Sequence, residues 1–182
     1  MTAYPTAAPV VTGGITEEEM RQEHPLFLQW DSRWGYAPYG DNNIGQCGCG
    51  PACLSMVIFS LTRREDATVD ALAGLAADGG YYAPGEGTSW TFLTDAAGAY
   101  GIFAEQVYVS ETNMRERLDA GQQLICSMGP GDFAAEGHFI VIYGYNENGY
   151  LVNDPNSLVR SAKTWDYQTL SSQMRSMWAY GR

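Results

Sequence analysis

The stretch GCGPACLSMVIFSL, residues 48–61, indicates the fold class and contains the first candidate functional residue. Its apolar residues recur at the i, i+3, i+4 and i+7 positions of a buried helix face: Leu54, Val57, Ile58 and Leu61. Pro51 is acceptable in a first helical turn, where a missing N–H leaves no bond unmade. The sequence therefore predicts a helix that starts just after Cys49.

Cys49 lies at the N-terminus of this predicted helix. A thiol is a nucleophile only as thiolate, and the free N–H groups and dipole of a helix N-terminus favour that anion. Gly48 and Gly50 remove side-chain bulk beside it, so we expect a substrate carbonyl to reach the sulfur past Gly48. Cys47 lies outside the helix and Cys53 one turn inside. Cys49 is thus the candidate nucleophile; the alternative is a small apolar residue at a helix start.

His138 is one of only two histidines and opens the most apolar stretch of the chain, HFIVIYGY at residues 138–145. It follows the glycine-rich segment 129–137, whose last residue, Gly137, is a second candidate for substrate contact. A strand that begins here can hold the imidazole at the sheet edge while its other residues are buried. The alternative is a structural histidine that is buried in the core with its ring nitrogens hydrogen-bonded there.

A predicted hairpin returns Asp154 to His138. Residues 138–145 and 150–153 read as two strands joined by a turn that contains glycine. A carboxylate that accepts from one imidazole nitrogen fixes the tautomer and leaves the other nitrogen for the thiol. Asp154 could instead form a turn before the following proline. The side chain of the adjacent Asn153 should point to the opposite face of the strand.

The remaining pattern predicts helices before strands, which indicates an α+β fold. Further helices are expected at residues 16–22, 69–77, 88–101, 112–120 and 167–174, and further strands at 103–109, 123–128 and 177–180. Residues 27–43 are rich in aromatic and turn-forming residues, and residues 79–87 form a loop punctuated by glycines.

The length of 182 residues and the 45% hydrophobic content fit one domain. We expect a tail or linker with a short helix over residues 1–23 and the domain over residues 24–182. No apolar run approaches the roughly 18 residues that a membrane span requires. The start lacks the features of a signal peptide, so the chain is expected to stay in the cytoplasm, or to act outside the cell or at its surface if a leader has been removed.

The charge of the chain argues against anionic partners. Twenty-one acidic residues against ten basic ones give a net charge of −11, so we expect neither nucleic acid nor anionic membranes as partners. No nucleotide loop or cofactor motif is present, and no cofactor is expected. The crowded Cys47, Cys49 and Cys53 could bind a metal with His138 or His24, but they lack paired C-x2-C modules, so we expect no metal.

Three motifs together resemble the C39 and C39-like peptidases, which are papain-like enzymes. The motifs are CGPACL at residues 49–54, GHFIV at 137–141 and NDP at 153–155, which resemble the nucleophile, histidine and aspartate segments of that family in the expected order. QWDSRWG at 29–35 and GTSW at 87–90 are similar to segments of the C39-like branch. The resemblance covers roughly residues 25–181.

This resemblance implies a papain-like cysteine peptidase fold, with N-terminal helices packed on a C-terminal antiparallel sheet. It implies hydrolysis of a peptide or protein substrate through a Cys49-His138-Asp154 triad and a thioester. The same type of catalytic triad is also used by cell-wall peptide amidases and transglutaminase-like acyl transferases, which are the alternatives. A non-catalytic binding module on the same fold is a further alternative.

Two other side chains are expected to act on the substrate. Transporter members of the family place an oxyanion-stabilising glutamine at the position of Asn43. We expect Gln29 to donate this hydrogen bond from across the cleft, because the tether from Gln46 to Cys49 looks too short. Trp90, beside the glycine loop, is expected to form one wall of the substrate groove; ordinary core packing is the alternative.

Overall fold

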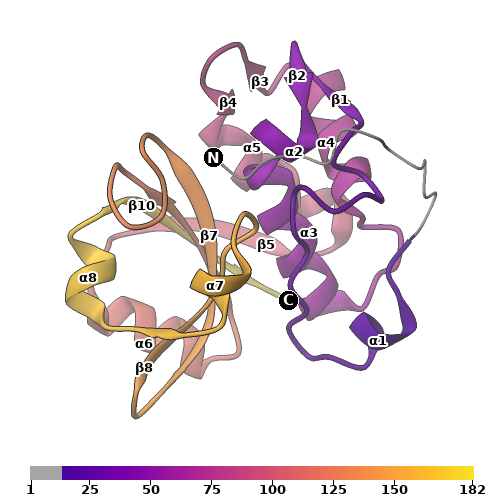
Figure 1. The fold of residues 1–182 in the computed structure, drawn as a ribbon. Helices are drawn as coiled ribbons and strands as arrows, with labels where there is room; N and C mark the ends of the chain where they lie inside the picture. Colours follow the sequence, from indigo (N-terminus) through magenta and orange to yellow (C-terminus); the bar gives the residue numbers. More distant parts are fainter. Residues whose placement is uncertain (1–13) are drawn as a thin grey trace.

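The computed structural model describes residues 14–182, which we call the described residues. They form a helical half and a sheet half that pack against each other (Figure 1). Of the tail or linker with a short helix expected over residues 1–23, residues 1–13 lie outside the described residues. Among the described helices, none combines the length and apolar character that a membrane crossing demands.

The helix α3 (Cys49–Thr62) is the centre of the helical half. It starts at Cys49, whereas the sequence predicted a start just after this residue, and it ends where Arg63 adopts the left-handed conformation with φ of 60°. Every residue from Gly50 to Phe59 is buried, whereas the apolar spacing indicated one buried face. The reason is that α4 (Val69–Asp78) packs against the helix from one side and β7 (His138–Asn146) from another.

Short elements complete the helical half. They are α1 (Glu17–Met20), β1 (Pro38–Tyr39), β2 (Asn42–Asn43), α2 (Ile44–Cys47), β3 (Tyr82–Ala83), β4 (Gly87–Thr88), α5 (Trp90–Asp95) and the 3-10 helix η1 (Ala97–Tyr100). The single helix predicted over residues 88–101 is thus split into α5 and η1. The second of these, η1, ends at Gly101, where the predicted helix was expected to end; the φ of Gly101 is 74°. The helix α2 was not predicted.

The helix α1 has Thr16 as its N-terminal cap. The Thr16 hydroxyl accepts from the Glu19 N–H at 3.1 Å, and the Glu19 carboxylate accepts from the Thr16 N–H. Arg33 lies 2.6 Å from the Glu19 carboxylate and fastens the helix to the rest of the fold. The division into residues 1–23 and 24–182 stays a prediction.

The sheet half is a six-stranded antiparallel sheet in the order β5-β10-β6-β7-β8-β9. Besides β7, its strands are β5 (Phe103–Val107), β6 (Gln123–Met128), β8 (Gly149–Asn153), β9 (Thr164–Trp165) and β10 (Met174–Gly181). The last strand, β10, therefore lies inside the sheet. The predicted strands and hairpin are present, while β9 and the helix α7 (Leu158–Ser161) were not predicted.

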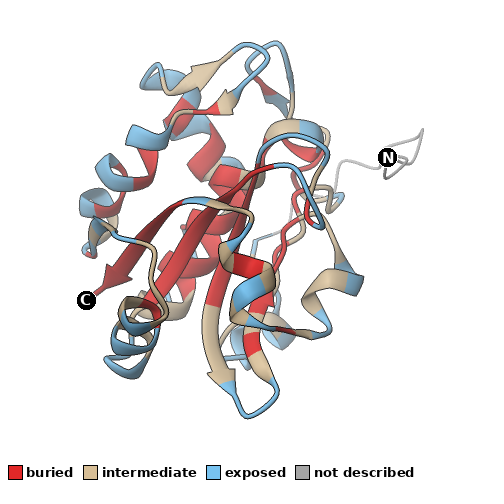
Figure 2. Cartoon of the chain, turned by 90° about the vertical axis from the view of Figure 1, so that its left-hand side faces the viewer, coloured by how far each residue is buried: buried red, intermediate tan, exposed pale blue. Residues whose placement is uncertain are grey.

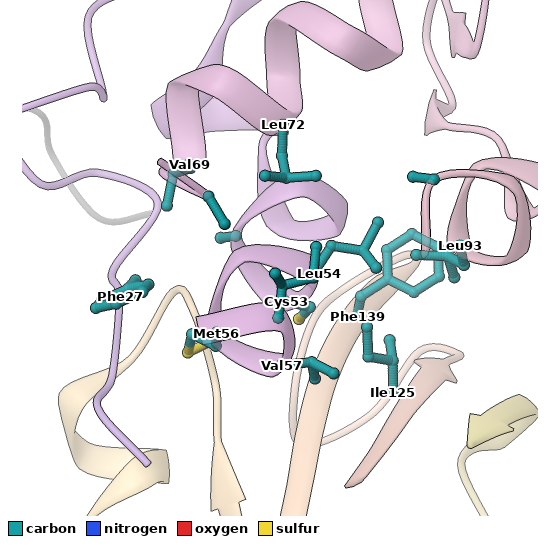
Figure 3. Packing of buried hydrophobic residues seen from close by; sticks show 14 of the residues in the cluster. Phe27, Cys53, Leu54, Met56, Val57, Val69, Leu72, Leu93, Ile125 and Phe139 are labelled. Carbon is teal, nitrogen blue, oxygen red and sulfur yellow. The ribbon is translucent and has the colours of Figure 1, made fainter. Parts of the chain in front are cut away.

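Two apolar cores lie on opposite faces of the sheet. Ile125, Phe139 and Trp178 join residues of α3 and α4 in the first core, part of which Figure 3 shows. Leu124 and Ile140, the strand neighbours of Ile125 and Phe139, join α6 (Glu111–Asp119) and α8 (Tyr167–Ser171) in the second. Figure 2 shows the central strands buried along most of their length. The predicted α+β class is confirmed.

Candidate active site

A cleft of about 980 Å³ lies between the two halves. The helical half lines it with the end of α2, the start of α3 and the segment from Tyr82 to Trp90, which includes the β3-β4 hairpin. The sheet half lines it with Ser127, Arg175 and residues around the start of β7. Cys49 and His138 both line this cleft, although they come from different halves of the molecule.

Cys49 is held by tight packing around the start of α3. A Cβ on Gly50 would lie 2.8 Å from Thr88 Oγ1, so only glycine lets α3 approach β4 so closely. A Cβ on Gly48 would lie 2.4 Å from the carbonyl oxygen of Ile44. Gly48 is buried and is not among the residues that line the cleft. The close contact between α2 and α3 explains why a glycine stands at position 48. The structure gives no support for the expected contact between Gly48 and a substrate.

His138 connects the two candidate catalytic groups. Its Nε2–H donates to Asp154 Oδ1 at 2.7 Å, and the ring also forms a hydrogen bond with the side chain of Cys49. Because Asp154 occupies Nε2, the nitrogen available to the sulfur is Nδ1. Burial alone would lower the pKa of His138, but the hydrogen bonds to Asp154 and Cys49 outweigh burial and raise it to about 9. The imidazole is therefore protonated at neutral pH.

Asp154 is fully buried, yet its carboxylate has three donors. Oδ1 accepts from His138 and from the Asn156 N–H at 2.8 Å, and Oδ2 accepts from Arg160 Nε at 2.6 Å. Burial would raise the pKa of Asp154, but the hydrogen bond from His138, its charge and the bond from Arg160 keep the pKa below the ordinary value. The carboxylate is ionised and lies between two cationic side chains.

Arg160 is a site residue that the sequence reasoning missed. It lies on α7, whose N-terminal cap is the Ser157 hydroxyl that accepts from the Arg160 N–H at 3.0 Å. A sequence signal for this contact was Ser157, a common N-cap residue. A short helix whose N-cap lies three residues after Asp154 can place a side chain of its first turn near the carboxylate. Asn153 is bound elsewhere: its amide donates to the His24 carbonyl at 3.1 Å.

The two glutamines are placed differently from the expectation. Gln29 is 3% exposed, and its Nε2 donates to the Gly45 carbonyl at 3.0 Å. It is not among the cleft-lining residues, and its Oε1 is buried without a partner in the described part of the chain. Gln46 is exposed and lines the cleft. These contacts favour Gln46 over Gln29 as oxyanion donor, because the turn of α2 brings residue 46 to the cleft.

Trp90 and Gly137 lie where a groove wall was expected. Trp90 lines the cleft, is 44% exposed, and packs edge-on against Trp178 with ring centroids 5.4 Å apart. Gly137 is exposed at the opposite wall, next to His138. A substrate would thus meet an indole on the helical side and open backbone on the sheet side.

A family model described as the Peptidase_C39 like family matches residues 21–181. The chain belongs to this family of C39-like peptidases. A search among curated proteins gives no match.

Two crystal structures resemble this C39-like chain. The first is the peptidase domain of Streptococcus ComA, a bi-functional ABC transporter involved in a quorum-sensing pathway. It has a TM-score of 0.59 and 19% identity, over 86% of this chain and 96% of that domain. The second, a Bacillus anthracis protein assigned as a C39-like peptidase, has a TM-score of 0.53 and 15% identity, over 93% of this chain and 98% of the other. At these identities they establish the papain-like fold.

The other three cysteines of this C39-like chain all have pKa values raised by burial. Burial raises the pKa of the Cys47 thiol, and full burial raises the pKa values of Cys53 and Cys126 much further. All four cysteines are free thiols. Within residues 14–182 no three histidine, cysteine or acidic side chains are grouped as metal ligands would be.

Proposed function

We propose that this chain is a cysteine peptidase that cuts peptide bonds through a thioester on Cys49. The observation that carries the proposal is the chain of hydrogen bonds from Cys49 through His138 to the buried Asp154, at the edge of an open cleft. A nucleophile, a base and a group that orients the base are the parts that such catalysis needs. Membership of a peptidase family supports the same reaction class.

In the proposed reaction the Cys49 thiolate attacks the carbonyl carbon of the scissile bond. The N–H of Cys49 and the Gln46 amide donate to the oxyanion that forms. His138, as imidazolium, then gives its Nδ1 proton to the leaving amine, and a thioester remains. The neutral His138 next takes a proton from water, which hydrolyses the thioester and restores Cys49. Asp154 keeps the imidazole oriented throughout and stays ionised.

The test is mass spectrometry of a peptide library incubated with the protein and with a Cys49→Ala variant. We expect new peptide termini with the unaltered protein and none with the variant. A Cys47→Ala variant is the matched control, since Cys47 also lines the cleft but has no histidine partner in the structure. Release of ammonia, or cross-links to an added amine, without new termini would favour an amidase or an acyl transferase instead.

Alkylation distinguishes an enzyme from a binding module on the same fold. We expect iodoacetamide near neutral pH to label Cys49 first, since the pKa values of Cys47, Cys53 and Cys126 are raised by burial. Peptide mapping of the labelled protein gives the four rates. Equal rates, or Cys47 ahead of Cys49, would contradict the assignment of the nucleophile.

A further inference from the structure

A β-bulge sets the position of Arg175 in β10. Met174 pairs with Met128 and Ser176 with Ser127, so Arg175 is an extra residue with no partner across the ladder. Such bulges bend the strand and change the direction of a side chain. Here the side chain reaches the cleft, where Arg175 is one of the lining residues and is exposed.

The guanidinium lies on the His138 side of the cleft. A Cβ on Gly129 would lie 3.0 Å from Arg175 Nε, and a Cβ on Gly137 would lie 3.9 Å from its Nη1. Gly137 directly precedes His138 in the chain. The absence of side chains at these two glycines therefore leaves room for the guanidinium beside the residue that precedes His138.

Arg175 is the one arginine or lysine among the described residues that line the cleft, which also include Asp41, Glu86 and Glu136. Within residues 14–182 it has no hydrogen-bond or ion-pair partner. The other arginines of this part, except the exposed Arg182, all bind a carboxylate or a backbone carbonyl: Arg21, Arg33, Arg63, Arg64, Arg115, Arg117 and Arg160. In a chain of net charge −11 an unpaired cation in the cleft is available to a ligand.

The direction of the reaction places the substrate beside this cation. A general acid must reach the leaving nitrogen, so the residues released as the amine product pass along His138. Since Arg175 lies next to Gly137, those residues pass the guanidinium. Its planar fork of donors matches a carboxylate, with which it can form two parallel hydrogen bonds.

We propose that Arg175 binds a substrate carboxylate on the leaving-group side of the scissile bond, so that the substrates are peptides with a negative charge shortly after the cut. This inference rests on the function proposed above. The carboxylate is either an acidic side chain or the C-terminal α-carboxylate of a short leaving segment. Both present the same two oxygens to the guanidinium.

The experiment uses eight-residue peptides with neutral randomised positions in three matched forms. One form has a single Glu at varied positions and a C-terminal amide, the second has Gln in its place, and the third has Gln and a free C-terminus. We expect kcat/KM about tenfold higher for at least one carboxylate form than for the neutral form, the ratio that one charge-assisted pair supplies. The form preferred identifies the source of the carboxylate.

Variants then assign the preference to Arg175. In Arg175→Gln the ratio of charged to neutral peptide should fall to about one, and Arg175→Lys should keep part of it. Arg182→Gln, which removes an exposed arginine that does not line the cleft, should keep the full ratio. A ratio of one in the unaltered protein, or the same ratio in Arg175→Gln, would overturn the inference while peptide cleavage and the proposed function stood.

A binding measurement tests the inference without turnover. Immobilised Cys49→Ala protein is mixed with the three peptide forms, and the retained peptides are quantified by mass spectrometry. We expect a carboxylate form to be enriched, although the net negative charge of the protein repels anionic peptides. The enrichment should be lost in the double variant Cys49→Ala/Arg175→Gln. Equal retention of the three forms would overturn the inference. Absence of cleavage together with Arg175-dependent enrichment would count against the peptidase and uphold the carboxylate site.

Discussion

At the scale of single residues, His138 is held in its charged state by its two neighbours. Asp154 accepts from one ring nitrogen, and Cys49 lies at the other, so a proton on both nitrogens is stabilised. The raised pKa means that His138 is an imidazolium at neutral pH, the form that donates a proton to the leaving amine in the proposed reaction. A histidine with the ordinary pKa near 6.5 would be mostly neutral at pH 7.

The pH profile of kcat/KM should therefore fall as pH rises through about 9, where His138 loses its proton. The stability that this proton contributes is complete below the unfolded pKa near 6.5 and is lost as pH rises through about 9. Asp154→Asn removes the charge that helps to raise this pKa, so the upper limb of the profile should move to lower pH. An upper limb that stayed in place in Asp154→Asn would contradict this electrostatic role.

Replacing Gln46 should affect mainly activity, whereas replacing Gln29 should affect mainly stability. Gln46→Ala should lower kcat by one or more powers of ten at unchanged melting temperature, because an oxyanion donor contributes about 3 kcal/mol and this side chain is exposed. Gln29→Ala should lower the melting temperature, because its buried hydrogen bond to Gly45 is lost. Activity assays and thermal unfolding on both variants measure this. Full activity in Gln46→Ala would exclude it as the donor.

At the scale of elements, the β7-β8 hairpin and α7 together position Asp154. Val141 pairs with Asn153, so the end of β8 lies beside the start of β7, where His138 stands. A slip of one residue would turn every side chain of β8 to the other face of the sheet. The chain then turns through α7, and Arg160 reaches back to the second carboxylate oxygen. Two elements thus constrain one carboxylate from two sides.

Arg160→Ala should lower turnover and weaken the fold in acid. The low pKa of Asp154 contributes stability that is present above its unfolded pKa and is lost as pH falls through the folded pKa. Without Arg160 the folded pKa rises, so this loss should begin at a higher pH. Melting temperatures from pH 3 to pH 7 measure the shift.

The matched control is Arg117→Ala, which breaks a partly exposed ion pair with Glu105, away from the site. Since surface pairs contribute little, its pH dependence should follow that of the unaltered protein. Arg160→Lys keeps the charge and should restore part of the activity that Arg160→Ala loses. Identical acid behaviour in Arg160→Ala and Arg117→Ala would mean that Arg160 does not support the carboxylate.

At the scale of the whole molecule, the sequence predicted those helices and strands whose apolar residues recur with a regular spacing. The apolar spacing after Cys49 predicted α3, and the two apolar strands with their glycine turn predicted the hairpin that joins His138 to Asp154. These signals are strong because each element buries residues with a fixed repeat. The three motifs also pointed to the family to which the chain belongs.

The rest depends on tertiary contacts that leave little trace in the sequence. The α2 turn, which brings Gln46 to the cleft, has four residues, too few for a helical repeat. The Arg175 bulge exists only as a register shift between two strands. Gln29 stands in a motif that resembles the family, yet the structure directs its amide to the Gly45 carbonyl. Motif position therefore did not decide which glutamine faces the cleft.

The interior place of β10 has a consequence for how the molecule is made on the ribosome. The helical half emerges first and carries Cys49, whereas β10, which is synthesised after the other five strands, lies between β5 and β6 in the sheet. Until it arrives the sheet has a gap beside β6, whose end pairs with His138. We therefore expect His138 to take up its position beside the Cys49 thiol only once β10 has been synthesised.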